Sequence, residues 1–262
     1  NTPKQIQIYK ALGYDEPIFA HLPMILGPDK KRLSKRHGAP GVQKFKNDGY
    51  FSGSLLNYLA LLGWNPGTEE EIFSINELAD AFDLKQVQKK GAVWDEKKLH
   101  WLSGQYVMAT STDDLLNAIR DNDPDWGKGS EISLLISIVE LLKVRAKSLI
   151  EFLNQSEYFF NDPVAYDEKG LKKAWKDGSV NTLISNFVES LMTLPAWRKE
   201  ELESTFRSYV SEKELGLGKI IMPVRLAICG TLNGPSIFDI MELVGKETCI
   251  RRLGTALERL PK

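Results

Sequence analysis

The sequence predicts a mainly α-helical protein. Apolar residues recur at intervals of three and four along most of the chain, and Gly, Pro and Asn mark the breaks between these segments. The C-terminal half lacks the alternation of apolar and polar residues that is typical of strands. The chain has 262 residues, which is long enough for two or three hydrophobic cores.

The breaks divide the chain into four blocks, which we expect at 1–40, 41–110, 111–167 and 168–262. In the second block we expect a helix through 55–62 and another through 74–82. Ser74 and Glu77 have the spacing of a capping box, which predicts where the second of these helices begins.

The third and fourth blocks are helical throughout. In the third block the pattern predicts a helix beginning near Asp113 and one long apolar helix over about 133–153. The fourth block should contain five helices, near 180–193, 198–213, 219–230, 236–244 and 246–260.

The last two helices show the pattern most clearly. Each carries one apolar stripe that we assign to a core, and Ser236 with Asp239 has the spacing of an N-terminal cap. The stripes consist of Ile237, Ile240, Met241 and Val244, and of Ile250, Leu253, Leu257 and Leu260. We expect Arg251, Arg252 and Arg259 to lie largely on other faces.

Charge and composition restrict the function classes. With 34 Lys or Arg and 35 Asp or Glu the net charge is −1, so any contact with RNA must be a local patch. Cys229 and Cys249, the only cysteines, lie in separate apolar segments, and the three histidines have no metal-ligand spacing, so we expect neither a disulfide nor a metal site. No apolar run approaches eighteen residues and no signal peptide is seen, which favours a cytoplasmic protein.

A basic run is the most informative local feature. Between Pro28 and Lys46 there are seven Lys or Arg and a single acid, Asp29. Glycine and proline on both sides predict a loop. Mobile lysines can follow a phosphate whose charge moves during reaction, so this run is consistent with half of an ATP site. On charge alone, a solvated basic turn is the alternative.

The sequence around this basic run resembles that of bacterial-type glutamyl-tRNA synthetases, a class I aminoacyl-tRNA synthetase family. The resemblance covers essentially the whole chain. It is carried by the segments 1–6, 19–27, 31–39, 56–64, 94–95, 98–102 and 245–247.

The resemblance implies a tail of a Rossmann-like catalytic domain at 1–40, a helical stem-contact domain at 41–110 and an all-helical anticodon-binding region in two subdomains. Residues 31–35 would be the KMSKS-type loop, with Lys35 catalytic and Lys31, Ser34 and Lys35 binding ATP. The HIGH-type element of the class is absent from the chain, so we expect a C-terminal fragment that begins just before this loop.

The resemblance also implies anticodon-binding residues. Arg145 matches the family segment that contacts the third anticodon base, and Arg225, Gly234 and Pro235 match a second anticodon-reading segment. The family position aligned with Gly234 can be Thr, and glycine removes any side-chain contact there. For each Arg, a plain surface charge on a helix is the alternative.

Two functions remain open. The first is part of a glutamate–tRNA ligase, which would use ATP with Mg²⁺, glutamate and tRNA(Glu), would act as a monomer, and would be inactive without its nucleotide-binding domain. The second is a noncatalytic tRNA-binding module. Glutaminyl enzymes carry β-barrel anticodon domains, and the small glutamyl-queuosine paralogues lack an anticodon domain, so neither fits this helical C-terminal half.

Overall fold

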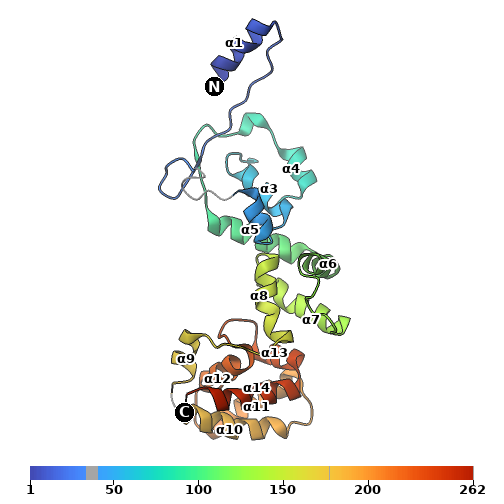
Figure 1. The fold of residues 1–262 in the computed structure, drawn as a ribbon, viewed down its shortest axis with the longest axis vertical. Helices are drawn as coiled ribbons and strands as arrows, with labels where there is room; N and C mark the ends of the chain where they lie inside the picture. The colour runs from blue at the N-terminus through green and yellow to red at the C-terminus, as the bar shows by residue number, and fades with distance from the viewer. Residues whose placement is uncertain (34–40, 177, 262) are drawn as a thin grey trace. The chain divides into compact units, whose positions relative to one another are not determined.

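The computed structural model describes residues 1–33, 41–176 and 178–261. Within them the protein is mainly α-helical, with two short strands, so the fold class predicted from the sequence is confirmed (Figure 1). The chain forms two compact units, 1–103 and 104–262. Helix α5 (Glu96–Ala109) contains the residues at which one unit ends and the next begins.

The first unit contains a small parallel pairing of β1 with β2, in which Ile25 pairs with Ala92 and Leu26 with Val93. A hydrophobic cluster centres on Trp64, which is 2% exposed. The elements of this unit before α5 are α1 (Thr2–Leu12), β1 (Ile25–Leu26), α2 (Val42–Asn47), α3 (Ser52–Leu61), α4 (Ile75–Ala81), the 3₁₀ helix η2 (Leu84–Gln86) and β2 (Ala92–Val93).

The predicted capping box at the start of α4 is confirmed. The Glu77 amide donates to Ser74 Oγ at 3.2 Å, and the Ser74 amide donates to Glu77 Oε2 at 2.7 Å. These two bonds satisfy amide groups that the first turn of a helix leaves without partners, which is why the helix begins here.

The second unit contains α6 to α14. Their bounds are α6 (Thr112–Asn122), α7 (Ile132–Lys143), α8 (Leu149–Phe160), α9 (Glu168–Ala174), α10 (Ser179–Met192), α11 (Lys199–Glu212), α12 (Gly218–Cys229), α13 (Ile237–Val244) and α14 (Lys246–Arg259). The five helices predicted after residue 180 are confirmed as α10 to α14. Within this group α14 packs against α10 and α12, and α13 packs against α11 (Figure 1).

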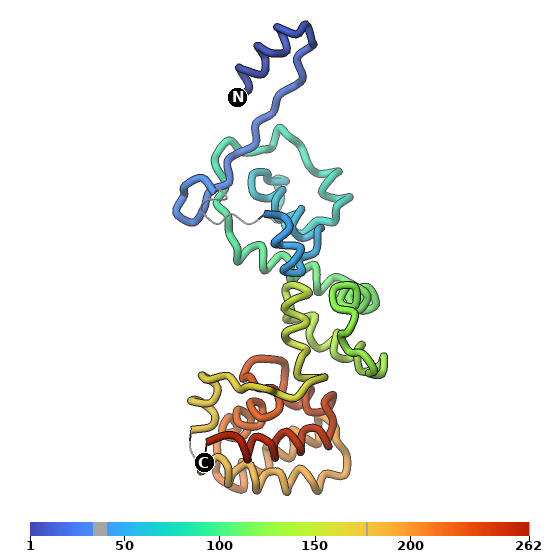
Figure 2. The backbone as a smooth tube through the Cα atoms, viewed as in Figure 1, coloured from blue at the N-terminus to red at the C-terminus, as the bar shows by residue number. Residues whose placement is uncertain are grey.

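The single long helix expected over 133–153 is wrong. The chain instead turns between α7 and α8 (Figure 2). Ser148 caps α8 by accepting a hydrogen bond from the Glu151 amide, and Glu151 Oε2 accepts from the Lys147 amide at 2.9 Å. These local bonds compete with continuation of α7, because they satisfy the amides that open a new helix.

The prediction for the arginines of α14 is wrong in one case. Arg251 and Arg259 are exposed, but Arg252 is 3% exposed. Its guanidinium is buried because it is surrounded by acceptors, three main-chain carbonyl oxygens and the carboxylate of Asp162. A buried charge needs such partners, and these come from other elements of the unit.

Candidate functional site

The described part of the basic run forms a tight turn. The Gly27 amide donates to the Lys31 carbonyl at 2.8 Å, the Lys30 amide donates to the Gly27 carbonyl at 2.9 Å, and Lys30 has a φ of 60°. Lys31 and its neighbours 30 and 32 are exposed. Ser34 and Lys35, together with the rest of 34–40, lie outside the described residues. The turn therefore presents three cations to solvent, where a polyphosphate could contact them.

Arg145 lies in the turn between α7 and α8, and its side chain is exposed. The break in the expected long helix is what places it there. The side chain lines a cavity of about 470 Å³. The other lining residues are Asn154, Gln155, Tyr158, Thr231, Asn233 and Gly234, so the described lining contains no acidic side chain.

Arg225 lies on α12 directly behind this cavity and is 9% exposed. Its Nη2 donates to the Pro235 carbonyl at 2.6 Å, which fixes the guanidinium against the loop that follows α12. Its Nη1 is buried and has no hydrogen-bond partner among the described residues. Burial lowers the pKa of this arginine, since desolvation disfavours the charged form.

Gly234 lines the cavity and lies beside the Arg225 guanidinium. Its φ is +144°, and a Cβ built at this position would lie 3.1 Å from Arg225 Nη1 and 3.3 Å from the Tyr158 hydroxyl. The structure thus brings Arg145, Arg225, Gly234 and Pro235 into one region of the second unit, although they come from segments about ninety residues apart in sequence.

Tyr158, on α8, is the member of this group that sequence reasoning missed. It is 7% exposed, and its hydroxyl is buried without a described partner. Burial raises the pKa of this hydroxyl, while the charges of Arg225 and Arg145 oppose the shift. Tyr158 stands directly before Phe159 and Phe160, so nothing in the sequence distinguishes it from a core aromatic.

The chemistry of this region is donor-rich and suits recognition rather than bond making. Arg145 and Tyr158 line the cavity together with amide and hydroxyl side chains, and the Arg225 guanidinium lies beside Gly234. Unstacked nucleobases are bound in such places through hydrogen bonds to their edges.

Cys229 and Cys249 are both buried thiols without a disulfide, and burial raises the pKa of Cys229 to about 12.

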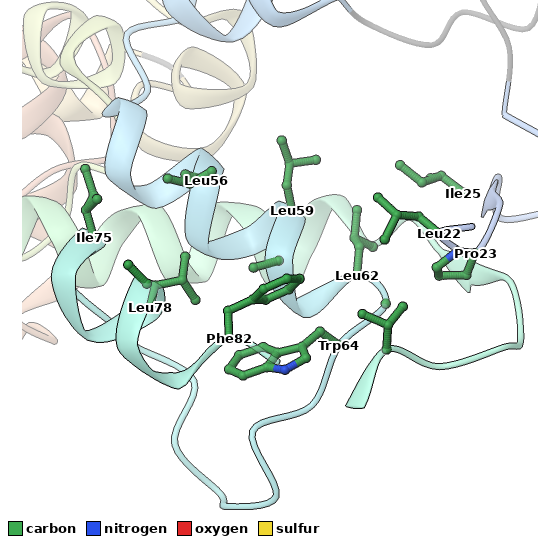
Figure 3. Close-up of a pocket in the computed structure, with 14 residues that line it drawn as sticks. Leu22, Pro23, Ile25, Leu56, Leu59, Leu62, Trp64, Ile75, Leu78 and Phe82 are labelled. Atoms are coloured by element: carbon green, nitrogen blue, oxygen red, sulfur yellow. The ribbon is translucent and has the colours of Figure 1, made fainter. Parts of the chain in front are cut away.

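A second cavity, of about 500 Å³, lies in the first unit and is apolar. Figure 3 shows Phe82 beside Trp64 at its base, with Leu56 and Leu59 of α3 along it; the two aromatic ring centres are 5.5 Å apart. Its lining, as far as the structure describes it, contains no charged side chain. It offers packing surface and no group that could read RNA or act on ATP.

In residues 1–33, 41–176 and 178–261, no three or more His, Cys, Asp or Glu side chains gather in a group that could hold a metal ion. None of the helices in those ranges combines the length and the apolar character needed to cross a bilayer.

Comparison with known proteins gives the same division of the chain. Residues 1–101 match the family model of the catalytic domain of class I tRNA synthetases (E and Q), and residues 96–257 match that of the anticodon binding domain. The chain is 40% identical to glutamate–tRNA ligase 1 of Syntrophomonas wolfei over 264 residues, which cover 100% of this chain and 53% of the relative. The chain belongs to the glutamyl-tRNA synthetase family.

Other members of the family agree. The glutamate–tRNA ligase of Moorella thermoacetica is 39% identical, over 98% of this chain and 54% of its own length. A crystal structure of a glutamate tRNA ligase from Elizabethkingia meningosepticum, in complex with its amino acid, matches with a TM-score of 0.78 and 32% identity, over 97% of this chain and 54% of that one. The chain therefore spans about half the length of the glutamyl-tRNA synthetases it matches.

Proposed function

We propose that this chain supplies the KMSKS-type loop and the tRNA-binding part of a glutamate–tRNA ligase. That enzyme activates glutamate with ATP and Mg²⁺, transfers it to the 3′ end of tRNA(Glu), and works as a cytoplasmic monomer. In this proposal 1–40 belongs to the catalytic domain, 41–110 contacts the tRNA stem, and 111–167 and 168–262 bind the anticodon.

The observation that carries the proposal is the donor-rich cavity between α8 and the loop after α12. Arg145 lines it and is exposed, and Arg225 lies beside Gly234 with its Nη1 unpaired among the described residues. A cytosine edge offers O2 and N3 as acceptors to an arginine fork, whereas a guanine edge offers the donors N1–H and N2–H₂. A cytosine at the third anticodon position therefore fits Arg145, and guanine does not.

The role in activation rests on the basic loop. When the glutamate carboxylate attacks the α-phosphate of ATP, pyrophosphate leaves and negative charge shifts along the phosphates. Lysines at 31 and 35 would stabilise that charge, and the Ser34 hydroxyl would supply a further hydrogen bond. No protein nucleophile is needed, because the substrate itself provides the attacking group.

Binding of tRNA by the 262-residue chain tests the proposal. We expect the chain to bind a tRNA(Glu) transcript more tightly than a tRNA(Gln) transcript at one fixed salt concentration, which must be held constant because phosphate contacts are salt-dependent. Equal affinity for both transcripts would reduce the chain to a nonspecific RNA-binding module. No binding of either would refute the proposal.

A further inference from the structure

Two buried polar atoms converge on Gly234 without partners. The Tyr158 hydroxyl and Arg225 Nη1 both lack a hydrogen-bond partner among the described residues, and their side chains are 7% and 9% exposed. A buried donor without a partner costs free energy, so native proteins retain one where something else, such as a ligand, completes it. Tyr158 lines the cavity that Arg145 lines, and Arg225 Nη1 lies 3.1 Å from the Cβ position of Gly234, which lines it too.

Glycine at 234 keeps the space between these atoms open. A Cβ there would lie 3.1 Å from Arg225 Nη1 and 3.3 Å from the Tyr158 hydroxyl, so a side chain at 234 would crowd both groups. The φ of +144° is one that residues with a side chain rarely adopt. A residue larger than glycine at 234 would place its own side chain here. In this chain the space is bordered instead by two polar groups, the Tyr158 hydroxyl of α8 and Arg225 Nη1 of α12.

We propose that the Tyr158 hydroxyl is a specificity-determining group of this cavity. The hydroxyl and Arg225 Nη1 both donate hydrogen bonds to the acceptor edge of one anticodon base, which lies at Gly234. This inference rests on the proposed function and extends it to a residue outside the family-derived set. The hydroxyl substitutes for a side chain at 234.

The expected ligand is a neutral base edge rather than a phosphate. Arg225 Nη2 is already engaged by the Pro235 carbonyl, so Nη1 and the neutral Tyr158 hydroxyl remain as donors. Taking a phosphate into so buried a place would cost more desolvation than these two groups return. A carbonyl oxygen or ring nitrogen of a base requires only the hydrogen bonds that they offer.

The Tyr158→Phe variant of the 262-residue chain tests the inference. It removes the hydroxyl and keeps the ring, which packs against Phe159 with ring centres 4.7 Å apart. We expect unchanged thermal stability, because the hydroxyl has no hydrogen-bond partner among the residues that the structure describes. Binding to a tRNA(Glu) transcript should weaken about tenfold, as for the loss of one hydrogen bond. The salt dependence of binding should stay the same, because no phosphate contact is lost.

Tyr209→Phe is the matched control. Tyr209 is also buried, at 5% exposure, but its hydroxyl donates to the Leu183 carbonyl at 3.0 Å. That variant should unfold about 2 to 4 °C earlier and bind tRNA as the unaltered chain does, since it loses an internal bond only. The two tyrosines should therefore show opposite patterns.

A second variant probes the space itself. In Gly234→Ala the new methyl would occupy the approach to both polar atoms, so tRNA binding should weaken. Gly245→Ala is its control, because Gly245 also has a positive φ, of +87°, but nothing lies within 4 Å of its Cβ position. It should lose stability and retain affinity.

Three results would overturn the inference. In the first, Tyr158→Phe binds tRNA(Glu) as tightly as the unaltered chain and is equally stable. In the second, Tyr158→Phe keeps its affinity but loses stability, as expected for Tyr209→Phe. Either of these two results leaves the proposed function standing. The third is failure of the unaltered chain to bind tRNA(Glu), which refutes the proposed function as well.

Discussion

The Nε of Arg252 donates to Oδ1 of Asp162 at 2.8 Å, and this pair joins α14 to the segment that follows α8. The same guanidinium donates to the carbonyl oxygens of Tyr158, Asn161 and Ile228, at 2.7, 2.9 and 2.9 Å. Tyr158 lines the cavity, and Ile228 lies near the end of α12, just before the loop that borders it. Arg252 therefore links α8 and the end of α12, the two elements that border the cavity, through hydrogen bonds.

Replacing Arg252 should destabilise the second unit strongly. Arg252→Met leaves three main-chain carbonyl oxygens, two of them buried, without this donor, and leaves the Asp162 carboxylate with Arg251 alone. We therefore expect unfolding to become easier by about 3 to 5 kcal/mol. Chemical denaturation followed by circular dichroism measures the change.

Arg251 provides the control for that experiment, because it pairs with the same carboxylate from an exposed position. Arg251→Met should cost less than about 1 kcal/mol. Similar losses for the two variants would contradict the assignment of Arg252 as the residue that joins these segments.

Acid should weaken the same junction. Hydrogen bonds from Arg251 and Arg252 hold the pKa of Asp162 at about 2, against an ordinary value of 3.8. Because the folded-state pKa is depressed, the stabilisation is complete above about pH 4 and is lost as the pH falls toward 2. The carboxylate is 48% exposed, so solvent screening reduces the effect.

Comparing the unaltered chain with the Asp162→Asn variant separates the contribution of Asp162 to the pH dependence of the free energy of unfolding from that of the other carboxylates. Between pH 5 and pH 3 the unaltered chain should lose roughly 0.5 to 1 kcal/mol more of its free energy of unfolding than the variant does. Parallel pH profiles for the two would mean that Asp162 makes no ionic contribution.

Arg145→Gln should change discrimination between tRNAs. Its exposed fork in the turn after α7 is proposed to read a cytosine edge at the third anticodon position, so the variant should bind tRNA(Glu) more weakly by about 1 to 3 kcal/mol. Binding of tRNA(Gln), which lacks that cytosine, should change little. Titrations of both transcripts at one salt concentration measure this, and an equal loss for both would make Arg145 a phosphate contact or a surface charge.

Lys35→Ala in a full-length glutamate–tRNA ligase that contains this chain should affect chemistry more than binding. The charge of Lys35 is proposed to act on the transferring phosphates, so the rate of adenylate formation should fall by orders of magnitude while tRNA affinity stays nearly constant. Single-turnover adenylate formation and tRNA titration separate the two effects. Comparable losses in both would remove Lys35 from catalysis.

The 262-residue chain alone should not catalyse glutamate-dependent exchange of pyrophosphate into ATP. Catalysis of adenylate formation requires both reactants to be held in line, and one lysine loop cannot position the adenine and the glutamate. Exchange above background by the purified chain, with heat-denatured chain as the control, would show that the missing pockets are not needed.

Local sequence determined most of the helices. Ser74 with Glu77 marks the start of α4 because both capping bonds form within one turn, and the apolar spacing of Ile237, Ile240 and Met241 gives the buried face of α13. Sequence motifs, such as those at 19–27 and 31–39, indicated the family. These features depend on neighbours a few residues apart, so they can be read from the chain directly.

Tertiary structure decided the burial of Arg252 and the position of Tyr158. The break between α7 and α8 is local: apolar periodicity runs through 133–153 without interruption, but Ser148 and Glu151 have the spacing of a helix cap, and their bonds open α8. Arg252 is buried because acceptors 24 to 94 residues away surround it, and Tyr158 differs from a core aromatic only through its closeness to Gly234. Periodicity reports which face of a helix is apolar, but the polar partners of a buried group come from distant segments and exist only once the fold has formed.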